Sequence, residues 1–240
     1  MKAGITGAAG NLGTTLVNGL RDKYDLKLFD LHAPANCKQF KFVQLDFAEP
    51  NHLPGVFADL DAIIHLAGNP NPSASRADTI RNNFVATSFV FEEARSAGIK
   101  KIVFASSNFY HQKDIASALR SVGDTLITLD ACATPECPYA ESKVFGENLG
   151  FHYANLGVSF VALRIGWSVP VDTPVPYDGA YMRAMFCSKR DLVQAFDKAL
   201  ETKEKFMAAF AISDNSGTVF DLTETKSKLS FYPQDNSANY

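Results

Sequence analysis

The fold is decided by residues 1–13, Met1-Lys2-Ala3-Gly4-Ile5-Thr6-Gly7-Ala8-Ala9-Gly10-Asn11-Leu12-Gly13. A short apolar run reaches Ile5, three glycines recur at every third position, and apolar residues then follow at helical spacing as far as Leu20. This pattern predicts a strand, a tight turn and a helix that begins at the turn. Glycine lets a phosphate approach the backbone, and a helix N-terminus attracts anions. We therefore expect the turn to hold the pyrophosphate of a dinucleotide, although a βα turn that binds nothing can carry similar glycines.

The next predicted strand ends in an acid, which bears on the choice of cofactor. Leu26-Lys27-Leu28-Phe29 is followed by Asp30, about twenty residues after the glycine loop, where a carboxylate accepts hydrogen bonds from the hydroxyls of an adenosine ribose. A carboxylate there also repels the 2′-phosphate of NADP, and no arginine follows Asp30 or lies in the glycine loop. The sequence therefore favours NAD. The alternative for Asp30 is a solvated acid in a loop.

Length and composition bound the class of protein. With 240 residues, of which 46% are hydrophobic, the chain is expected to bury a full core. A net charge of −3 gives no basic footprint for nucleic acid, and no apolar run reaches membrane-spanning length. The chain enters a strand at once, which leaves no room for a signal peptide, so we expect a cytoplasmic protein. The four cysteines and five histidines show no metal-ligand spacing, and no metal is expected.

The rest of the chain alternates strand and helix patterns. Strands are expected over 40–45, 62–66, 102–105 and 208–212, and helices over 53–60, 76–97 and 188–200. Such alternation predicts a parallel sheet covered on both faces. We therefore expect a Rossmann-type, doubly wound α/β fold. Residues 1–166 would form its NAD-binding domain, and residues 167–240 a small C-terminal substrate cap that is not an independent domain.

Polar residues and glycines follow several of these strands, at the edge where open α/β sheets bind ligands. Asp46-Phe47 follows one strand, and its aspartate is a candidate partner for the adenine amino group. Leu66-Ala67-Gly68-Asn69 follows another, directly after His65, which is expected to be a core histidine with local hydrogen bonds. Asn83 lies inside the long helix, where asparagine is unfavourable, which indicates a hydrogen-bonding role.

Three further residues carry the expected chemistry. Ser107 lies at the end of a strand, and Tyr139 and Lys143 stand four residues apart at the start of a predicted helix, so the pair shares a helix face. A nearby ammonium lowers the pKa of a tyrosine from its usual value near about 10. Tyr139 is therefore expected to remove a hydroxyl proton while hydride leaves the same carbon. Lys143 would also bind the nicotinamide ribose, and Ser107 would hold the substrate oxygen. Taken alone, a Tyr-x-x-x-Lys pair also occurs on exposed helix faces.

These motifs together resemble the extended short-chain dehydrogenases/reductases of the NAD-dependent epimerase/dehydratase group. The likeness follows the family's order from the glycine loop through Phe104-Ala105-Ser106-Ser107-Asn108 and Pro138-Tyr139 to Arg164-Ile165-Gly166, and covers nearly the whole chain. It implies Ser107, Tyr139 and Lys143 as catalytic residues. The implied NAD-binding residues are Gly7, Gly10, Asn11, Leu12, Gly13, Asp30, Asp46, Phe47, Leu66, Ala67, Gly68, Asn83, Ala105, Tyr139, Lys143 and Ile165.

Within that group the chain is similar to uronate dehydrogenase and related NAD-dependent sugar dehydrogenases, which implies a small sugar or sugar acid as substrate. Only about seventy residues follow Arg164-Ile165-Gly166, which leaves little to grip a nucleotide. The chain departs from those relatives at Phe109, where they have histidine, and at Trp167, where they have serine. Arg183 is the nearest candidate for their carboxylate-binding arginine. The expected substrate contacts are Asn69, Ser106, Asn108, Trp167 and Arg183.

Two other functions stay open at this point. One is a nucleotide-sugar epimerase or dehydratase that retains NAD. The other is a non-catalytic dinucleotide-binding regulator, against which the complete set of Ser107, Tyr139 and Lys143 argues. The resemblance also makes a homodimer a hypothesis, paired through the helices that bear Asn83 and Tyr139. The sequence leaves open the identity of the sugar, the direction of the reaction and the role of the long segment 110–137, whose apolar pattern runs over 115–129.

Overall fold

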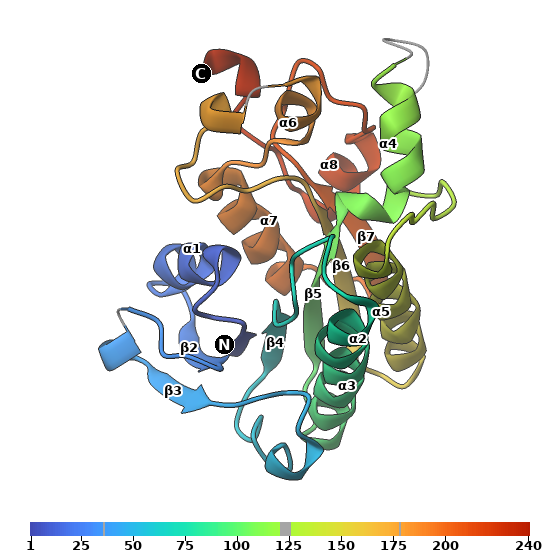
Figure 1. Ribbon diagram of the computed structural model, residues 1–240. Helices are drawn as coiled ribbons and strands as arrows, with labels where there is room; N and C mark the ends of the chain where they lie inside the picture. The colour runs from blue at the N-terminus through green and yellow to red at the C-terminus, as the bar shows by residue number, and fades with distance from the viewer. Residues whose placement is uncertain (36, 121–125, 178) are drawn as a thin grey trace.

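The computed structural model describes residues 1–35, 37–120, 126–177 and 179–240, and a parallel sheet runs through its centre (Figure 1). The strands of these residues are β1 (Lys2–Thr6), β2 (Asp25–Asp30), β3 (Lys41–Gln44), β4 (Ala62–His65), β5 (Lys101–Ser107), β6 (Ser159–Ile165) and β7 (Phe206–Ala211). Their order in the sheet is β3-β2-β1-β4-β5-β6-β7. The strand order therefore reverses between β1 and β4, where doubly wound sheets open a crevice for ligands.

Helices cover both faces of this sheet. The α-helices of the described residues are α1 (Asn11–Leu20), α2 (Arg76–Thr79), α3 (Ala86–Ser96), α4 (Gln112–Ala118), α5 (Pro138–Asn155), α6 (Ala180–Met185), α7 (Lys189–Glu201) and α8 (Thr223–Leu229). Successive strand residues point to opposite faces. Figure 1 shows α1 and α7 on one face of the sheet and α3 and α5 on the other. Val103 accordingly packs in one core with residues of α1 and α7, and Phe104 in another with residues of α3 and α5. The predicted Rossmann-type, doubly wound α/β fold is confirmed.

Two glycines allow α5 to lie close against the sheet. A Cβ on Gly146 would lie 2.4 Å from the Phe104 ring, and a Cβ on Gly150 would lie 2.2 Å from the Phe160 ring. Any larger residue would push the helix away from β5 and β6. This close packing fixes the position of α5, whose first two turns carry the predicted catalytic tyrosine and lysine.

The two helical predictions between β3 and β5 had different outcomes. The helix expected over 76–97 is present as α2, a π-helical segment over Ile80–Val85 and α3 in direct succession. The helix expected over 53–60 is wrong, because a 3-10 turn over Pro50–His52 leads instead into a series of turns. Gly55 and Asp59 adopt positive φ angles of 79° and 66°, which an α-helix does not accommodate.

The long segment 110–137 builds a small additional core beyond β6 and β7. It contributes α4, and Ile127 forms a parallel β-bridge with Phe220. Ile115 and Ile127 pack with Phe210 and Phe220 in one cluster of buried residues. Part of the apolar pattern expected over 115–129 falls on residues 121–125, which lie outside the described residues. The described part of this segment thus packs against β7 and the residues that follow it.

Residues 167–240 do more than cap the sheet, since they also supply its outer strand β7 and the covering helix α7. The rest of this portion, with α6 and α8, lies near α4 at the top of the view in Figure 1. Asp191, in the first turn of α7, is fully buried and accepts hydrogen bonds from the Gln234 and Asp235 backbones and from Ser213 Oγ. This carboxylate ties the C-terminal segment to the sheet. Among the helices of the described residues, none has the length and apolarity that a membrane crossing requires.

Candidate active site

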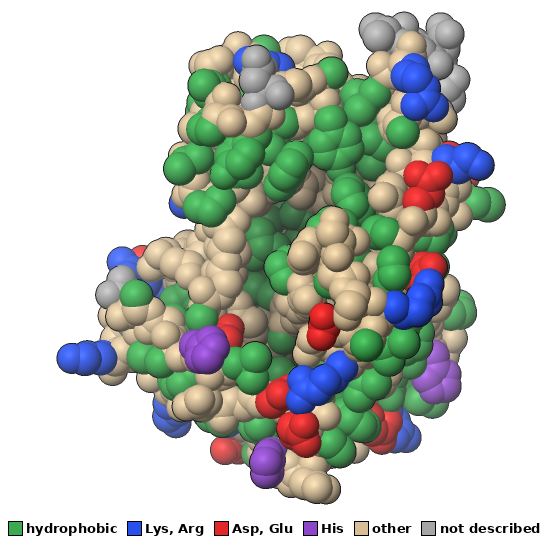
Figure 2. Space-filling view, viewed as in Figure 1, with side chains coloured by type: hydrophobic (Ala, Val, Ile, Leu, Met, Phe, Trp, Pro, Cys, Tyr) green, Lys and Arg blue, Asp and Glu red, His purple; other side chains and the backbone are tan. Residues whose placement is uncertain are grey.

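A cavity of about 850 Å³ opens at the carboxyl ends of β1, β2, β4, β5 and β6. Figure 2 shows it as the hollow between the upper and lower parts of the molecule. One end is lined by the glycine loop, and the other by Ser107, Tyr139 and the segment that follows β6. Its position coincides with the reversal of strand order between β1 and β4. The strand-end residues chosen from the sequence thus meet at one place.

The glycine loop has the geometry of a dinucleotide cradle. Gly7 has φ +72°, and a Cβ on it would lie 2.8 Å from the Ala67 backbone nitrogen. A Cβ on Gly13 would lie 2.3 Å from the Gly7 carbonyl oxygen, so the first turn of α1 can pack against the loop only with glycine there. Gly10 is the N-cap of α1, with no side-chain cap and no acid in the first turn. A phosphate can therefore approach the positive end of this helix, and these residues fit NAD.

Two acids, Asp30 and Asp46, line the cavity at the ends of β2 and β3. Asp30 Oδ2 accepts a hydrogen bond from Ala9 N at 2.9 Å, which fixes the carboxylate beside the glycine loop. Asp46 accepts from Arg81 Nη2 at 2.8 Å and from Ala48 N at 2.9 Å. Although burial opposes it, these hydrogen bonds hold the pKa of Asp46 below its usual value. Both acids are placed where the sequence predicted, with Phe47 beside them in the wall.

Asn83, which was predicted to contact the cofactor, makes hydrogen bonds within the protein. It is buried and lies outside the cavity lining. Its Oδ1 accepts from Asn69 N at 2.7 Å, and its Nδ2 donates to Asn69 O at 3.0 Å and to Ser142 Oγ at 3.2 Å. Asn83 thus holds the backbone of the Gly68-Asn69 wall against α5. These bonds are the hydrogen-bonding role inferred from its place in a helix, whereas the direct cofactor contact stays a prediction.

His65 is a core histidine, as expected. Its ring nitrogens lie 2.8 Å from Thr6 Oγ1 and 3.1 Å from Thr87 Oγ1, and its ring stacks on Phe104. Burial lowers the pKa of His65 to about 3, and the Lys143 ammonium adds to this effect. The imidazole is therefore neutral at physiological pH.

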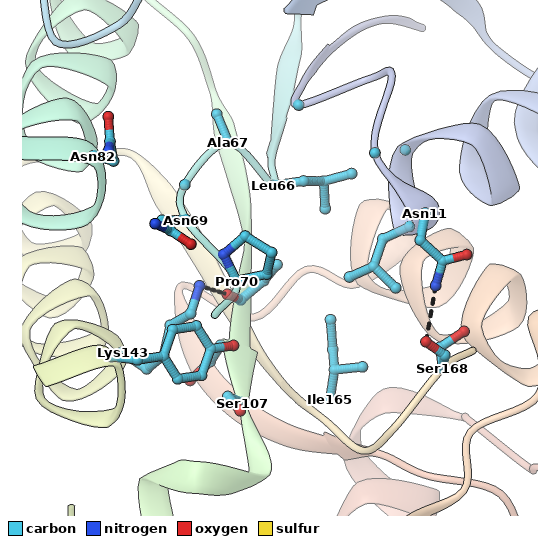
Figure 3. A pocket seen from close by; sticks show the side chains of 18 of the residues that line it. Asn11, Leu66, Ala67, Asn69, Pro70, Asn82, Ser107, Lys143, Ile165 and Ser168 are labelled. Carbon is cyan, nitrogen blue, oxygen red and sulfur yellow. Dashed lines mark hydrogen bonds between the residues drawn. The ribbon is translucent and has the colours of Figure 1, made fainter. Parts of the chain in front are cut away.

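Tyr139, Lys143 and Ser107 all line the other end of the cavity. Figure 3 shows Lys143 and Ser107 there. Lys143 Nζ donates to Ala105 O at 2.8 Å and lies 5.3 Å from the centroid of the Tyr139 ring. Burial lowers the pKa of Lys143 to about 8. Burial also raises the pKa of Tyr139, and the nearby Ser107 hydroxyl opposes this effect only in part. The expected lowering of the tyrosine pKa is thus wrong for the protein alone, because desolvation of the phenolate outweighs the hydrogen bond from Ser107.

Ser106 belongs to a buried network behind the cavity wall. Its hydroxyl donates to Glu147 Oε1 at 2.5 Å, and Arg164 Nη2 donates to Glu147 Oε2 at 2.9 Å. Arg164 also reaches His111 Nε2 at 2.9 Å, and its guanidinium carbon lies 3.5 Å from the centroid of the Tyr110 ring. The Ser106 residue lines the cavity, but its hydroxyl is committed to Glu147. The substrate contact expected of Ser106 stays a prediction, and its hydroxyl supports the wall through Glu147.

The end of the cavity beside Ser107 combines aromatic rings with amides. Asn108 Nδ2 donates to Tyr181 Oη at 2.8 Å, and the Tyr181 ring packs edge-on to Trp167 at 5.8 Å between centroids. Arg183, expected in the substrate pocket, lies outside the lining and donates from Nη1 to Ser237 O at 3.2 Å. Asn11 Nδ2 donates to Ser168 O at 2.8 Å and so joins the glycine loop to the segment after β6 (Figure 3).

The cavity therefore contains the predicted cofactor residues apart from Asn83, and the predicted substrate residues apart from Arg183. The lining residues that sequence reasoning missed are Ala9, Leu31, His32, Leu45, Pro70, Pro72, Asn82, Ala86, Phe109, Gly166, Ser168 and Tyr181. Most of these residues are sequence neighbours of a predicted site residue, and this adjacency is the signal that could have identified them. The signal for Tyr181 is the stretch from Val169 to Tyr181, whose proline, aspartate and glycine residues predict a loop over the site. Within the described ranges, no group of three His, Cys, Asp or Glu side chains could hold a metal.

A Rossmann fold with a glycine cradle, an acid at the end of the second strand and a Ser-Tyr-Lys set in the same cavity defines an NAD-binding enzyme of the short-chain dehydrogenase/reductase type. Comparison with known proteins agrees. The model of the NAD dependent epimerase/dehydratase family matches residues 3–167, and the chain belongs to this family.

Its relatives include dehydrogenases that act on sugars. The chain is 35% identical to L-arabinose 1-dehydrogenase (NAD(P)(+)) of Haloferax volcanii, over 98% of this chain and 96% of that protein. It is 30% identical to uronate dehydrogenase of Pseudomonas putida, over 98% and 85% of the two chains. The crystal structure of uronate dehydrogenase from Agrobacterium tumefaciens superposes with a TM-score of 0.84 at 27% identity, covering 99% of this chain and 86% of that one.

Proposed function

We propose that this protein is an NAD-dependent dehydrogenase that transfers a hydride between NAD and a hydroxyl or carbonyl carbon of a small sugar or sugar acid. The observation that carries the proposal is the meeting of Ser107, Tyr139 and Lys143 in the cavity that the glycine loop also lines. The relatives named as arabinose and uronate dehydrogenases support the substrate class.

The chain's own residues divide the work. NAD, when bound, supplies the hydride acceptor. Ser107 holds the substrate oxygen, and Tyr139 accepts the hydroxyl proton during oxidation or returns it during reduction. Lys143, with a pKa of about 8, is mostly protonated at neutral pH. Its charge lies 5.3 Å from the ring centroid of Tyr139 and stabilises the phenolate as it forms.

Absorbance at the NADH band tests this proposal. Purified protein and NAD are mixed with a panel of aldoses, hexuronates and sugar phosphates, beside Tyr139→Phe and a matched control, Tyr153→Phe. Tyr153 lies on the same helix, but its hydroxyl donates to Glu92 outside the cavity. We expect NADH from at least one sugar with the native protein and with Tyr153→Phe, and a loss of at least about a hundredfold with Tyr139→Phe. Undiminished activity of Tyr139→Phe would contradict the proposal.

We also propose a cytoplasmic homodimer. The four cysteines are free thiols, which fits a reducing compartment. Ile80 is 46% exposed. Next to it, the half-buried ring of Phe84 in the Ile80–Val85 segment packs on the ring of Phe145 in α5, with 5.0 Å between the ring centroids. These apolar side chains support pairing through that surface. Light scattering that gave only the monomer mass at working concentration would contradict the dimer.

A further inference from the structure

The substrate end of the cavity is built from neutral side chains. Trp167 and Tyr181 form one wall, and Asn108 and Phe109 lie next to the catalytic Ser107. Trp167 remains 44% exposed although its ring contacts Tyr177 and Tyr181, so a face of the indole can receive a ligand. Aromatic walls with a few fixed polar groups are typical of sites for small ligands.

Helix α6 decides which of its polar side chains reaches this end. Tyr181 and Arg183 are two residues apart, which places them about 200° apart around the helix. Tyr181 lines the cavity, whereas Arg183 donates to Ser237 O and its own carbonyl accepts from Ser237 Oγ at 2.7 Å. The helix therefore presents a phenol to the cavity and turns its guanidinium toward the C-terminal segment.

A chain of hydrogen bonds sets the direction of the Tyr181 hydroxyl. Ser107 Oγ donates to Asn108 Oδ1 at 3.2 Å, and Asn108 Nδ2 donates to Tyr181 Oη at 2.8 Å. Because the phenol oxygen accepts from an amide, it keeps its own proton for donation to another oxygen. Burial raises the pKa of Tyr181 to about 12, so the phenol stays neutral. The catalytic serine and this donor are thus linked through one amide.

Charge gives the second part of the argument. Among the described residues that line the cavity, Lys143 is the only lysine or arginine. Its ammonium already donates a hydrogen bond to Ala105 O. A carboxylate or phosphate carried on the sugar would instead face Tyr181, Trp167 and Phe109. An anion that is taken out of water without a cationic partner is strongly disfavoured.

We propose that the substrate is an uncharged aldose, whose ring lies on Trp167 and one of whose oxygens accepts a hydrogen bond from Tyr181, and that this end of the cavity selects against uronates and sugar phosphates. The inference rests on the proposed dehydrogenase function and names its substrate class. Tyr181 is the residue that determines specificity, and Asn108 positions it.

Matched pairs of sugars test the proposal. Galactose against galacturonate, and glucose against glucose 6-phosphate, differ mainly in the charged group. With saturating NAD, we expect kcat/KM of the native protein to favour the neutral member by at least about tenfold. Tyr181→Phe should lower kcat/KM for the neutral sugar by about tenfold, mainly through KM and with an unchanged pH profile. Tyr181→Arg should shift the preference toward the uronate, and Tyr177→Phe, outside the lining, should behave as the native protein.

A binding assay separates this inference from the proposed function. The chain has one tryptophan, Trp167, so its fluorescence reports on the substrate end. If no sugar yields NADH but neutral aldoses change the fluorescence and their charged counterparts do not, the proposed function fails and the specificity stands. The specificity would be overturned if the charged member of each pair had an equal or higher kcat/KM, or bound equally well or better by fluorescence. It would also be overturned if Tyr181→Phe had the native kcat/KM for the neutral sugar.

Discussion

Removing the negative charge of Glu147 is expected to destabilise the protein strongly. Its carboxylate is the counter-ion of Arg164, and both side chains are almost completely buried, at 5% and 4% exposure. Glu147→Gln keeps the shape of the side chain but leaves the guanidinium without an opposite charge. It also turns an amide NH₂ toward the Arg164 donors.

The structure sets the size of the effect. At the 2.9 Å separation of Arg164 Nη2 and Glu147 Oε2, the attraction is about 6 kcal/mol with the effective dielectric constant of about 20 that suits protein sites. Desolvation of both ions offsets much of this in the native protein. Removing one partner alone leaves that cost uncompensated, which typically lowers the free energy of unfolding by about 3–5 kcal/mol.

The same helix offers a matched control. Glu141 of α5 pairs with Arg76 at 3.3 Å, but these side chains are 42% and 65% exposed. In water the attraction at that distance is about 1 kcal/mol, and exposed pairs of this kind typically contribute about 0–1 kcal/mol.

Urea unfolding followed by circular dichroism, without NAD, compares Glu147→Gln with Glu141→Gln. We expect losses of about 3–5 and less than about 1 kcal/mol respectively, at equal m values. Equal, small losses in both variants would refute the reasoning that burial makes Glu147 indispensable.

Three further results are expected. Gly13→Ala should weaken NAD binding by at least about tenfold in equilibrium dialysis, because the new Cβ would meet the Gly7 carbonyl oxygen. The control Gly217→Ala, whose Cβ meets nothing within 4 Å, should bind NAD as the native protein does. Equal affinities of the two variants would exclude the glycine loop as the NAD-binding cradle. The pKa of His65 is about 3 in the fold against an ordinary value of 6.5, so protons taken up below pH 6.5 favour the unfolded chain. On acidification below that pH, the free energy of unfolding measured in urea should fall by about 1 kcal/mol per pH unit less for His65→Gln than for the native protein. Equal falls in both proteins would contradict the buried neutral imidazole. Because burial raises the pKa of Tyr139, kcat/KM for oxidation should still rise with pH between about 6 and 8, and a plateau below pH 7 would show that the free enzyme has a far more acidic base.

Local patterns predicted much of the fold and of the cofactor site. The glycine loop and Asp30 follow from short-range periodicity and from the rule that acids after the second strand meet a ribose. Tyr139 and Lys143 follow from the spacing of residues on a helix. These features depend on neighbours in the sequence, so the sequence is sufficient to place them.

The failures share a physical cause, which is packing between distant segments. The burial of Met182 and Met185 determines which residue of α6 faces the cavity. The sequence pattern does not show this orientation, and the cavity is lined by Tyr181 rather than by the expected Arg183. The bond from Ser106 to Glu147 joins residues 41 positions apart and leaves no periodic pattern. Similarly, the spacing of Tyr139 and Lys143 indicates a charge near the tyrosine but not how deeply it is buried. Burial depends on the whole fold, and it is what raises the pKa of Tyr139.

The most direct test of the proposed dehydrogenase follows the hydride itself. An aldose deuterated at the carbon that bears the reacting hydroxyl is incubated with NAD and the protein, and the cofactor is analysed by mass spectrometry. The account predicts that deuterium accumulates in released NADH and that Tyr139→Phe abolishes the transfer. Deuterium that stays on the sugar while the carbon inverts, with no net NADH, would contradict a dehydrogenase and identify an epimerase.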